Sequence, residues 1–151
     1  MAASNSPLII LVHGAWHGAW CWAALQAELD SRGMPSLAID LPGHGASGQP
    51  FSDLHGDAAA VARLIERLGT PVTLVGHSYG GAVISQAAAG LSAVAHLVYL
   101  AAYVPDIGES VTGMSVAMPK VEIPLSKAMA VDGDGLVIDA AKAGPIFYGH
   151  A

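Results

Sequence analysis

Basic residues and cysteine are scarce in this chain of 151 residues, and both shortages limit what it can bind or form. Only 12% of the residues are charged, and 6 Lys and Arg stand against 12 Asp and Glu. Nucleic-acid surfaces need clustered basic side chains, so the net charge of −6 argues against a nucleic-acid partner. The single cysteine, Cys21, excludes an internal disulfide framework and is expected to be a small buried hydrophobe.

The sequence also lacks long apolar runs and an N-terminal segment with basic residues. No apolar run approaches the ~18 residues that a membrane span requires, so no membrane partner is expected. The N-terminus, MAASNSPLIILVH, has no Lys or Arg before its short apolar run and does not fit a secretory signal. These absences predict a soluble, cytoplasmic protein of about one domain, whose oligomeric state the sequence leaves open.

The apolar residues, 53% of the chain, are arranged as short runs that alternate with longer helix-like segments. Four of the runs have little polar alternation, which is typical of strands covered on both faces. These predicted strands are LIILV (8–12), SLAID (36–40), VTLV (72–75) and HLVYLA (96–101).

Apolar residues at helical spacing fill the intervals between these runs. They predict helices over residues 22–32, 54–68 and about 79–90. Asp53 is a suitable N-cap for the second helix, and Gly69 a suitable end. Strands and helices in alternation predict an α/β protein with a parallel sheet and helices on both of its faces.

Residues 73–82, TLVGHSYGGA, place Ser78 between a predicted strand and a predicted helix. The segment Gly76-His77-Ser78-Tyr79-Gly80 matches the pattern G-x-S-x-G, which acquires its meaning from this strand–turn–helix context. The tight turn forces the serine into strained geometry, and the flanking glycines avoid clashes. The hydroxyl then lies at a helix N-terminus, which favours developing negative charge. We interpret Ser78 as a catalytic nucleophile; the alternative is a serine in an ordinary glycine-rich turn.

His13 and Gly14 directly follow the first predicted strand. A serine that attacks an acyl carbon needs two backbone N–H groups directed at the resulting oxyanion. In hydrolases with this serine turn, one donor follows the nucleophile and the other lies in the loop after an earlier strand. The expected donors are therefore the N–H groups of Tyr79 and Ala15. The alternative is that His13 and Gly14 only shape a turn.

Two further patterns match cofactor or metal sites only superficially. Residues 43–48 fit G-x-G-x-x-G, but they run into QPF and do not open a helix, so no dinucleotide cofactor is expected. His13 and His17 are four residues apart in a glycine-rich loop that lacks the Glu of a zinc helix, so no metal site is expected. His55 is expected at the surface and His96 in the core.

Three motifs in this order resemble the α/β-hydrolase superfamily: LVHGAWHGAWCW (11–22), DLPGHGASG (40–48) and LVGHSYGGAV (74–83). More narrowly, HGAWHGAWCW and AAYVPD resemble the small esterases grouped with plant methylesterases, salicylic-acid-binding esterases and hydroxynitrile lyases. The resemblance covers about residues 7–106. It implies that the strands lie in the order second, first, third, fourth. The DLPGHG loop is then a structural turn near the pocket.

The resemblance also implies the hydrolysis of carboxylic esters through an acyl-Ser78 intermediate, without a metal or organic cofactor. Small or aromatic esters are the expected substrates. The resembled lyases have threonine at the position of Gly14, so Gly14 favours an esterase over a lyase. A low-turnover ligand-binding protein with the same fold is a further alternative.

A serine nucleophile of this kind also needs an acid and a histidine that acts as general base. The resembled family carries both after two further strands, beyond a lid. Asp106 and His150 are the local candidates for these roles. We expect the acid and the base to follow residue 151, and the 151 residues alone to be a poor enzyme with one poorly covered sheet face.

On the same basis, residues 1–103 are expected to be the N-terminal part of a hydrolase core and residues 104–151 the start of an incomplete lid. From Val104 the composition shifts to Pro, Gly, Met and Ser, and no further strands are expected. Short helices are expected over LSKAMA (125–130) and VIDAAKAG (137–144).

Overall fold

A computed structural model of the chain describes residues 7–119, 121–133 and 135–149. The chain divides into two compact units, Met1–Val111 and Thr112–Ala151. The division into a hydrolase core (1–103) and an incomplete lid (104–151) stays a prediction. None of the helices formed by the described residues combines the length and the apolar character that a membrane crossing needs.

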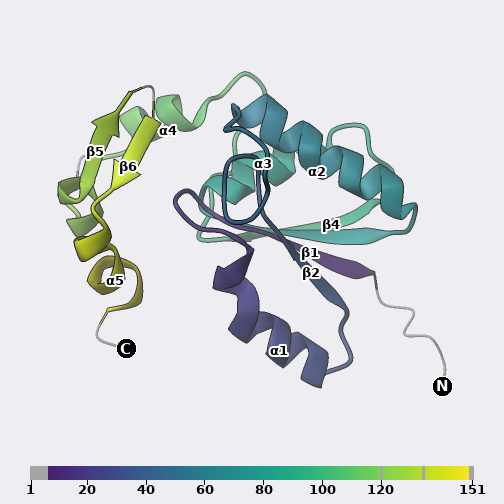
Figure 1. The fold of residues 1–151 in the computed structure, drawn as a ribbon. Coiled ribbons are helices and arrows are strands. Elements are labelled where there is room, and N and C mark those ends of the chain that lie inside the picture. Colours follow the sequence, from purple (N-terminus) through teal and green to yellow (C-terminus); the bar gives the residue numbers. More distant parts are fainter. Residues whose placement is uncertain (1–6, 120, 134, 150–151) are drawn as a thin grey trace. The chain divides into compact units, whose positions relative to one another are not determined.

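The first unit contains a parallel sheet of four strands in the order β2-β1-β3-β4 (Figure 1). This order confirms the predicted α/β fold. Strand β3 continues two residues beyond its predicted C-terminal end. Strand β4 begins two residues before its predicted start and ends one residue before its predicted end. The bounds are β1 (Leu8–Val12), β2 (Ser36–Ile39), β3 (Val72–His77) and β4 (Val94–Leu100).

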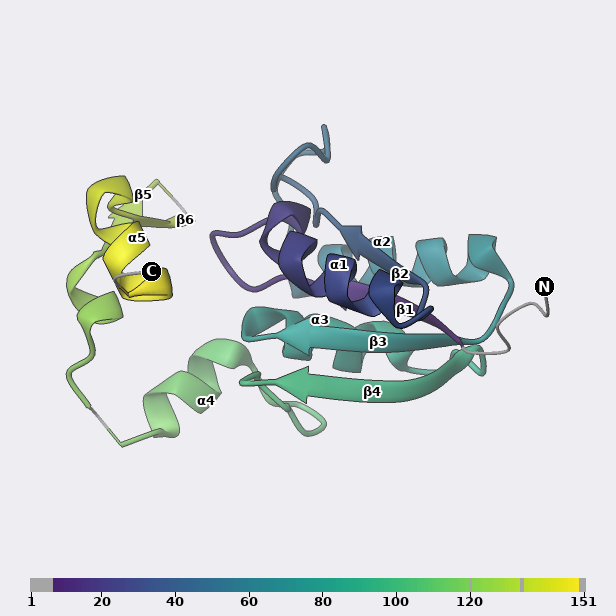
Figure 2. The ribbon, with the colours of Figure 1, turned by 90° about the horizontal axis from the view of Figure 1, so that it is seen from below.

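Helices cover both faces of this sheet, as predicted. The helix α1 (Ala23–Ser31) lies on one face, and α2 (Leu54–Leu68) and α3 (Tyr79–Ala88) lie together on the other (Figures 1 and 2). A short 3-10 turn, η1 (Ala19–Trp22), precedes α1, so the α-helix itself begins one residue later than predicted.

The caps predicted for α2 are both present. The Asp53 carboxylate accepts a hydrogen bond from the Gly56 N–H at 2.8 Å, which satisfies one of the free donors at the helix start. At the other end Gly69 adopts φ 61, the left-handed conformation that terminates helices. The N-cap and the C-terminal glycine therefore fix the helix boundaries that the sequence indicates.

Neighbouring residues of β1 enter two separate cores because side chains alternate across a strand. Ile10 and Val12 lie in the larger core, beneath α2 and α3. Ile9 and Leu11 lie in the smaller core, where they pack against Trp22. We call these the α2/α3 face and the α1 face of the sheet.

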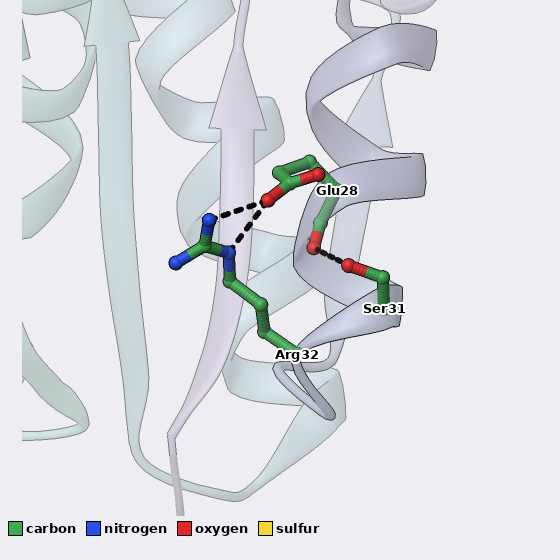
Figure 3. A network of polar contacts seen from close by, with 3 residues as sticks. All are labelled: Glu28, Ser31 and Arg32. Atoms are coloured by element: carbon green, nitrogen blue, oxygen red, sulfur yellow. Dashed lines mark hydrogen bonds and ion pairs between the residues drawn. The ribbon is translucent and has the colours of Figure 1, made fainter.

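The helix α1 buries little of itself and is supported partly by its own surface contacts. None of its residues is buried. At its C-terminal end the Arg32 guanidinium contacts the Glu28 carboxylate at 2.5 Å, and the Ser31 hydroxyl donates to the Glu28 carbonyl at 2.8 Å (Figure 3). These contacts lie within one turn and do not join α1 to the sheet.

The expected positions of three single residues have different outcomes. His55 is exposed on α2, as predicted. The expectation that His96 lies in the core is wrong, because His96 is exposed. It lies opposite Thr73 on β4, which is an edge strand of the described sheet. Cys21 is half-buried rather than fully enclosed.

The second unit contains short elements, among them a hairpin that the sequence analysis missed. An antiparallel pair forms where no strand was expected. The residues of the two expected helices are split between this hairpin and its neighbours. The elements are α4, which begins on the last residue of the first unit (Val111–Ala117), η2 (Pro124–Lys127), β5 (Met129–Asp132), β6 (Gly135–Ile138) and α5 (Ala140–Tyr148).

Candidate active site

Ser78 lies in the turn between β3 and α3, in a backbone conformation that is rare for a residue with a side chain. Its φ is 54 and its ψ is −119. Strain of this kind costs on the order of 1–3 kcal/mol and persists only where the surroundings hold it. The Ser78 carbonyl accepts hydrogen bonds from the N–H groups of Gly81 at 3.0 Å and Tyr103 at 3.1 Å. The strained serine turn that the motif predicts is therefore present.

The glycines at positions 76 and 80 are required by close backbone approach. A Cβ at Gly76 would lie 2.5 Å from the Gly80 carbonyl oxygen. A Cβ at Gly80 would lie 2.5 Å from the carbonyl oxygen of Val12 at the end of β1. No side chain fits at either position, so both glycines allow α3 to begin directly against the sheet.

Gly14 touches the serine turn from the neighbouring strand. Strands β1 and β3 are adjacent, with Val12 beside Gly76, so the loop after β1 lies next to the turn after β3. A Cβ at Gly14 would lie 2.9 Å from the Ser78 Cβ and 3.1 Å from His77 Nδ1. The two loops expected to hold the oxyanion donors are therefore in contact. The roles of the Ala15 and Tyr79 N–H groups stay predictions.

His13 is fully buried and connects the loop after β1 to the loop after β2 through its hydrogen bonds. Its Nε2 accepts from the Leu41 N–H at 3.1 Å, so its Nδ1, 2.8 Å from the Gly14 carbonyl oxygen, is the donor. Burial lowers the pKa of His13, and the hydrogen bond to Gly14 opposes this only in part. His13 is therefore a neutral ring with both nitrogens occupied, which suits a structural role.

Asp40, at the end of β2, organises the same loops and was missed by the sequence analysis. Its Oδ1 accepts from the Ala19 N–H at 2.6 Å and its Oδ2 from the Ala46 N–H at 2.9 Å. Burial raises the pKa of Asp40, but these two hydrogen bonds and nearby histidines outweigh it, so the pKa lies below its usual value. The available signal was an aspartate directly before the glycine-rich turn LPGHG.

Aromatic rings gather beside Ser78 on the α1 face. The ring of His17 stacks on Trp20 with centroids 5.4 Å apart. His77 meets both His17 and Trp22 edge-on at 6.4 Å. Burial, and then the neighbouring His17, lower the pKa of His77. Across the described ranges, no three His, Cys, Asp or Glu side chains are placed to hold a metal ion.

Among the described residues, the structure brings no acid or base into a hydrogen bond with the serine hydroxyl. Asp106 is exposed, and its carboxylate accepts from the adjacent Ile107 N–H at 2.7 Å. Among the residues that the structure describes, no side chain forms a hydrogen bond with the Ser78 hydroxyl. His150 lies outside the described residues. The acid and the base therefore stay predictions.

Comparison with known proteins places these features in a family. Residues 9–149 match the sequence profile described as "Alpha/beta hydrolase family". Methylesterase 7 of Arabidopsis thaliana is 36% identical over 114 residues, which are 71% of this chain and 44% of that protein. The carbendazim hydrolyzing esterase of Nocardioides sp. (strain SG-4G) is 37% identical over 133 residues, 82% of this chain and 52% of that protein.

A solved structure of a hydrolase also resembles this chain in its fold. A pyrethroid hydrolase from Sphingobium faniae JZ-2 superposes with a TM-score of 0.78 at 28% identity, covering 96% of this chain and 62% of that one. The chain spans about half the length of the curated relatives it matches. A plant methylesterase is among these relatives, as the segments HGAWHGAWCW and AAYVPD predict.

Proposed function

The chain belongs to the alpha/beta hydrolase family, and from this membership we propose that Ser78 is the nucleophile of a hydrolase that acts on carboxylic esters. One observation carries the proposal: Ser78 occupies a strained turn at a helix start, and the Gly14 backbone lies against its Cβ. The names of the relatives support the bond type, because both curated relatives are esterases.

In the proposed reaction the Ser78 oxygen attacks the acyl carbon of the ester, and a general base takes the hydroxyl proton. The N–H groups of Ala15 and Tyr79 stabilise the negative oxygen that forms, and the positive end of the α3 dipole adds to this. The alcohol leaves with the proton, and an acyl-Ser78 ester remains. Water then attacks this ester and releases the acid. The scheme uses no metal or organic cofactor.

We extend the proposal to small or aromatic esters as substrates. Trp20 supports this extension, because it is 58% exposed and its ring stacks on the buried His17, which gives this side of the site an aromatic wall. Flat, apolar groups of a substrate pack well against such a wall. The general base, a histidine by family resemblance, and a cytoplasmic location stay predictions of the sequence.

The test is covalent labelling of the full-length protein with a fluorophosphonate, followed by mass spectrometry of the tryptic peptides. We expect one adduct, on Ser78, and its loss in Ser78→Ala. The control is Ser85→Ala, which removes a serine from the same helix and should leave the adduct in place. A folded full-length protein that takes up no probe, or a Ser78→Ala variant that still does, would contradict the proposal. The first result would favour a ligand-binding protein.

A further inference from the structure

A buried acid on α2 contacts the first residue of α3. The Tyr79 hydroxyl donates to Asp57 Oδ2 at 2.7 Å. Asp57 is 2% exposed, and its other oxygen, Oδ1, has no partner among the described residues. Buried carboxyl oxygens are normally paired, so this contact is the main polar anchor of the side chain.

The surroundings of Asp57 make its bond to Tyr79 hard to replace. Burial raises the pKa of Asp57, although the Tyr79 hydrogen bond opposes the rise. The pKa of the Tyr79 hydroxyl is raised as well, by burial and by Asp57, so this hydroxyl stays a donor. Removal of the Tyr79 hydroxyl would leave the buried Asp57 carboxylate unpaired, which costs more than the bond itself contributes.

Tyr79 connects this contact to the serine turn. It directly follows Ser78 and is the first residue of α3, so its backbone lies in the strained turn while its ring reaches α2. The proposed oxyanion donor is the Tyr79 backbone N–H. A donor acts only when it is held at the right place before the reaction begins.

We propose that Asp57 is a positioning residue, which holds the Tyr79 side chain against α2 and so fixes the Tyr79 N–H beside Ser78. This inference rests on the nucleophile role proposed for Ser78. Asp57 touches neither the substrate nor the reacting atoms; it acts through Tyr79. Its contribution comes from the α2/α3 face of the sheet, opposite the aromatic wall.

The experiment compares four variants of the full-length protein: Asp57→Ala, Asp57→Asn, Tyr79→Phe and Ser85→Ala. Asp57→Asn keeps an oxygen that can accept from Tyr79. Ser85→Ala is the matched control, because it removes the hydrogen bonds of Ser85 to the Gly81 carbonyl and to Tyr99 of β4 but leaves the bond between Asp57 and Tyr79 in place. Two quantities are measured: the fluorophosphonate labelling rate of Ser78 over probe concentration, and the amide exchange of the peptide covering residues 76–82.

Loss of a complete oxyanion donor costs about 10²–10³-fold in rate, so a loosened donor should cost about 10-fold. We expect this drop in the maximal labelling rate for Asp57→Ala and Tyr79→Phe, at unchanged half-saturating probe concentration, together with faster exchange over 76–82. Asp57→Asn should recover most of the rate, and Ser85→Ala should match the native chain. Native behaviour of Asp57→Ala, or an equal loss in Ser85→Ala, would overturn the inference.

Two outcomes separate this inference from the proposed function. If the native chain takes no label, the nucleophile role fails, and amide exchange over 76–82 alone decides whether Asp57 holds the turn. If Asp57→Ala does not fold, Tyr79→Phe removes the same hydrogen bond while keeping the ring. A Tyr79→Phe variant with native exchange and native labelling would then reject the positioning role.

Discussion

The two faces of the sheet differ in the size of their cores, because among the described residues the larger core holds 11 buried hydrophobic residues and the smaller core 3. On the α2/α3 face the side chains of Ile10 and Leu74 are completely enclosed. On the α1 face Val98 and Leu100, which the strand register places beside Val75 and His77, remain 45% and 48% exposed. The serine turn lies between these environments, and its helix packs on the better buried one. The α2/α3 face is thus the more extensively packed side of the sheet, and the α1 face is the more exposed one.

The largest expected effect, which tests this comparison most directly, comes from substitutions at two neighbouring residues of β1, Ile9 and Ile10. Ile10→Ala empties the enclosed α2/α3 core and should lower the free energy of unfolding by about 3–5 kcal/mol. Ile9→Ala acts on the thinner α1 side and should cost about 2 kcal/mol, because that site is more open to relaxation. Urea unfolding followed by circular dichroism gives both values. Equal losses would mean that the two faces contribute alike.

As the pH falls, the packing of the α1 face should be lost at a higher pH than that of the α2/α3 face. The pKa of His77 is lowered in the folded chain, so between that value and the ordinary histidine pKa of about 6.5 the unfolded chain binds more protons. The stabilisation that the neutral His77 ring contributes is fully present above about pH 6.5. It is lost as the pH falls from about 6.5 through the lowered pKa of His77. His13, with its lowered pKa, adds in the same direction.

Tryptophan fluorescence measures this effect selectively, because all 3 tryptophans lie between the end of β1 and the start of α1. We expect the fluorescence change to begin at higher pH than the loss of helical circular dichroism. His77→Gln should move the fluorescence change to lower pH. Coincident transitions, or no response to His77→Gln, would show that the histidines do not divide the faces in this way.

The exposed residues of β4 give a smaller effect on stability. Val98→Lys should change the free energy of unfolding by only about 0.5 kcal/mol, because the side chain is already partly in water. It should reduce self-association, since an exposed apolar strand at a sheet edge promotes contact between chains. Sedimentation velocity at several concentrations measures this. A loss of stability as large as that of Ile9→Ala would mean that Val98 belongs to a packed core.

The smallest effect concerns the surface of α1. Arg32→Ala removes the exposed ion pair with Glu28, which should cost about 0.3–0.5 kcal/mol and less at high salt. Unfolding at low and high salt measures the difference. A cost above about 1 kcal/mol would indicate that α1 depends on this pair rather than on its contacts with the sheet.

Local patterns predicted the features that depend on neighbouring residues. Asp53 and Gly69 marked the ends of α2 because caps act within one turn, and the G-x-S-x-G spacing located the strained serine. Contacts between distant residues have no such pattern, so the bond between Asp57 and Tyr79 was not foreseen. The hairpin of the second unit was missed because its strands of 4 residues each are too short for a clear alternation.

The hydrogen bond from Tyr103 to the Ser78 carbonyl also has a consequence for the order of folding. The strained turn is held partly by a residue that follows β4, so it lacks one of its restraints until β4 has paired with β3. Contacts between residues far apart in sequence form late, because the intervening chain must first be ordered. During synthesis, the serine turn therefore lacks this restraint until the ribosome has released the chain past Tyr103.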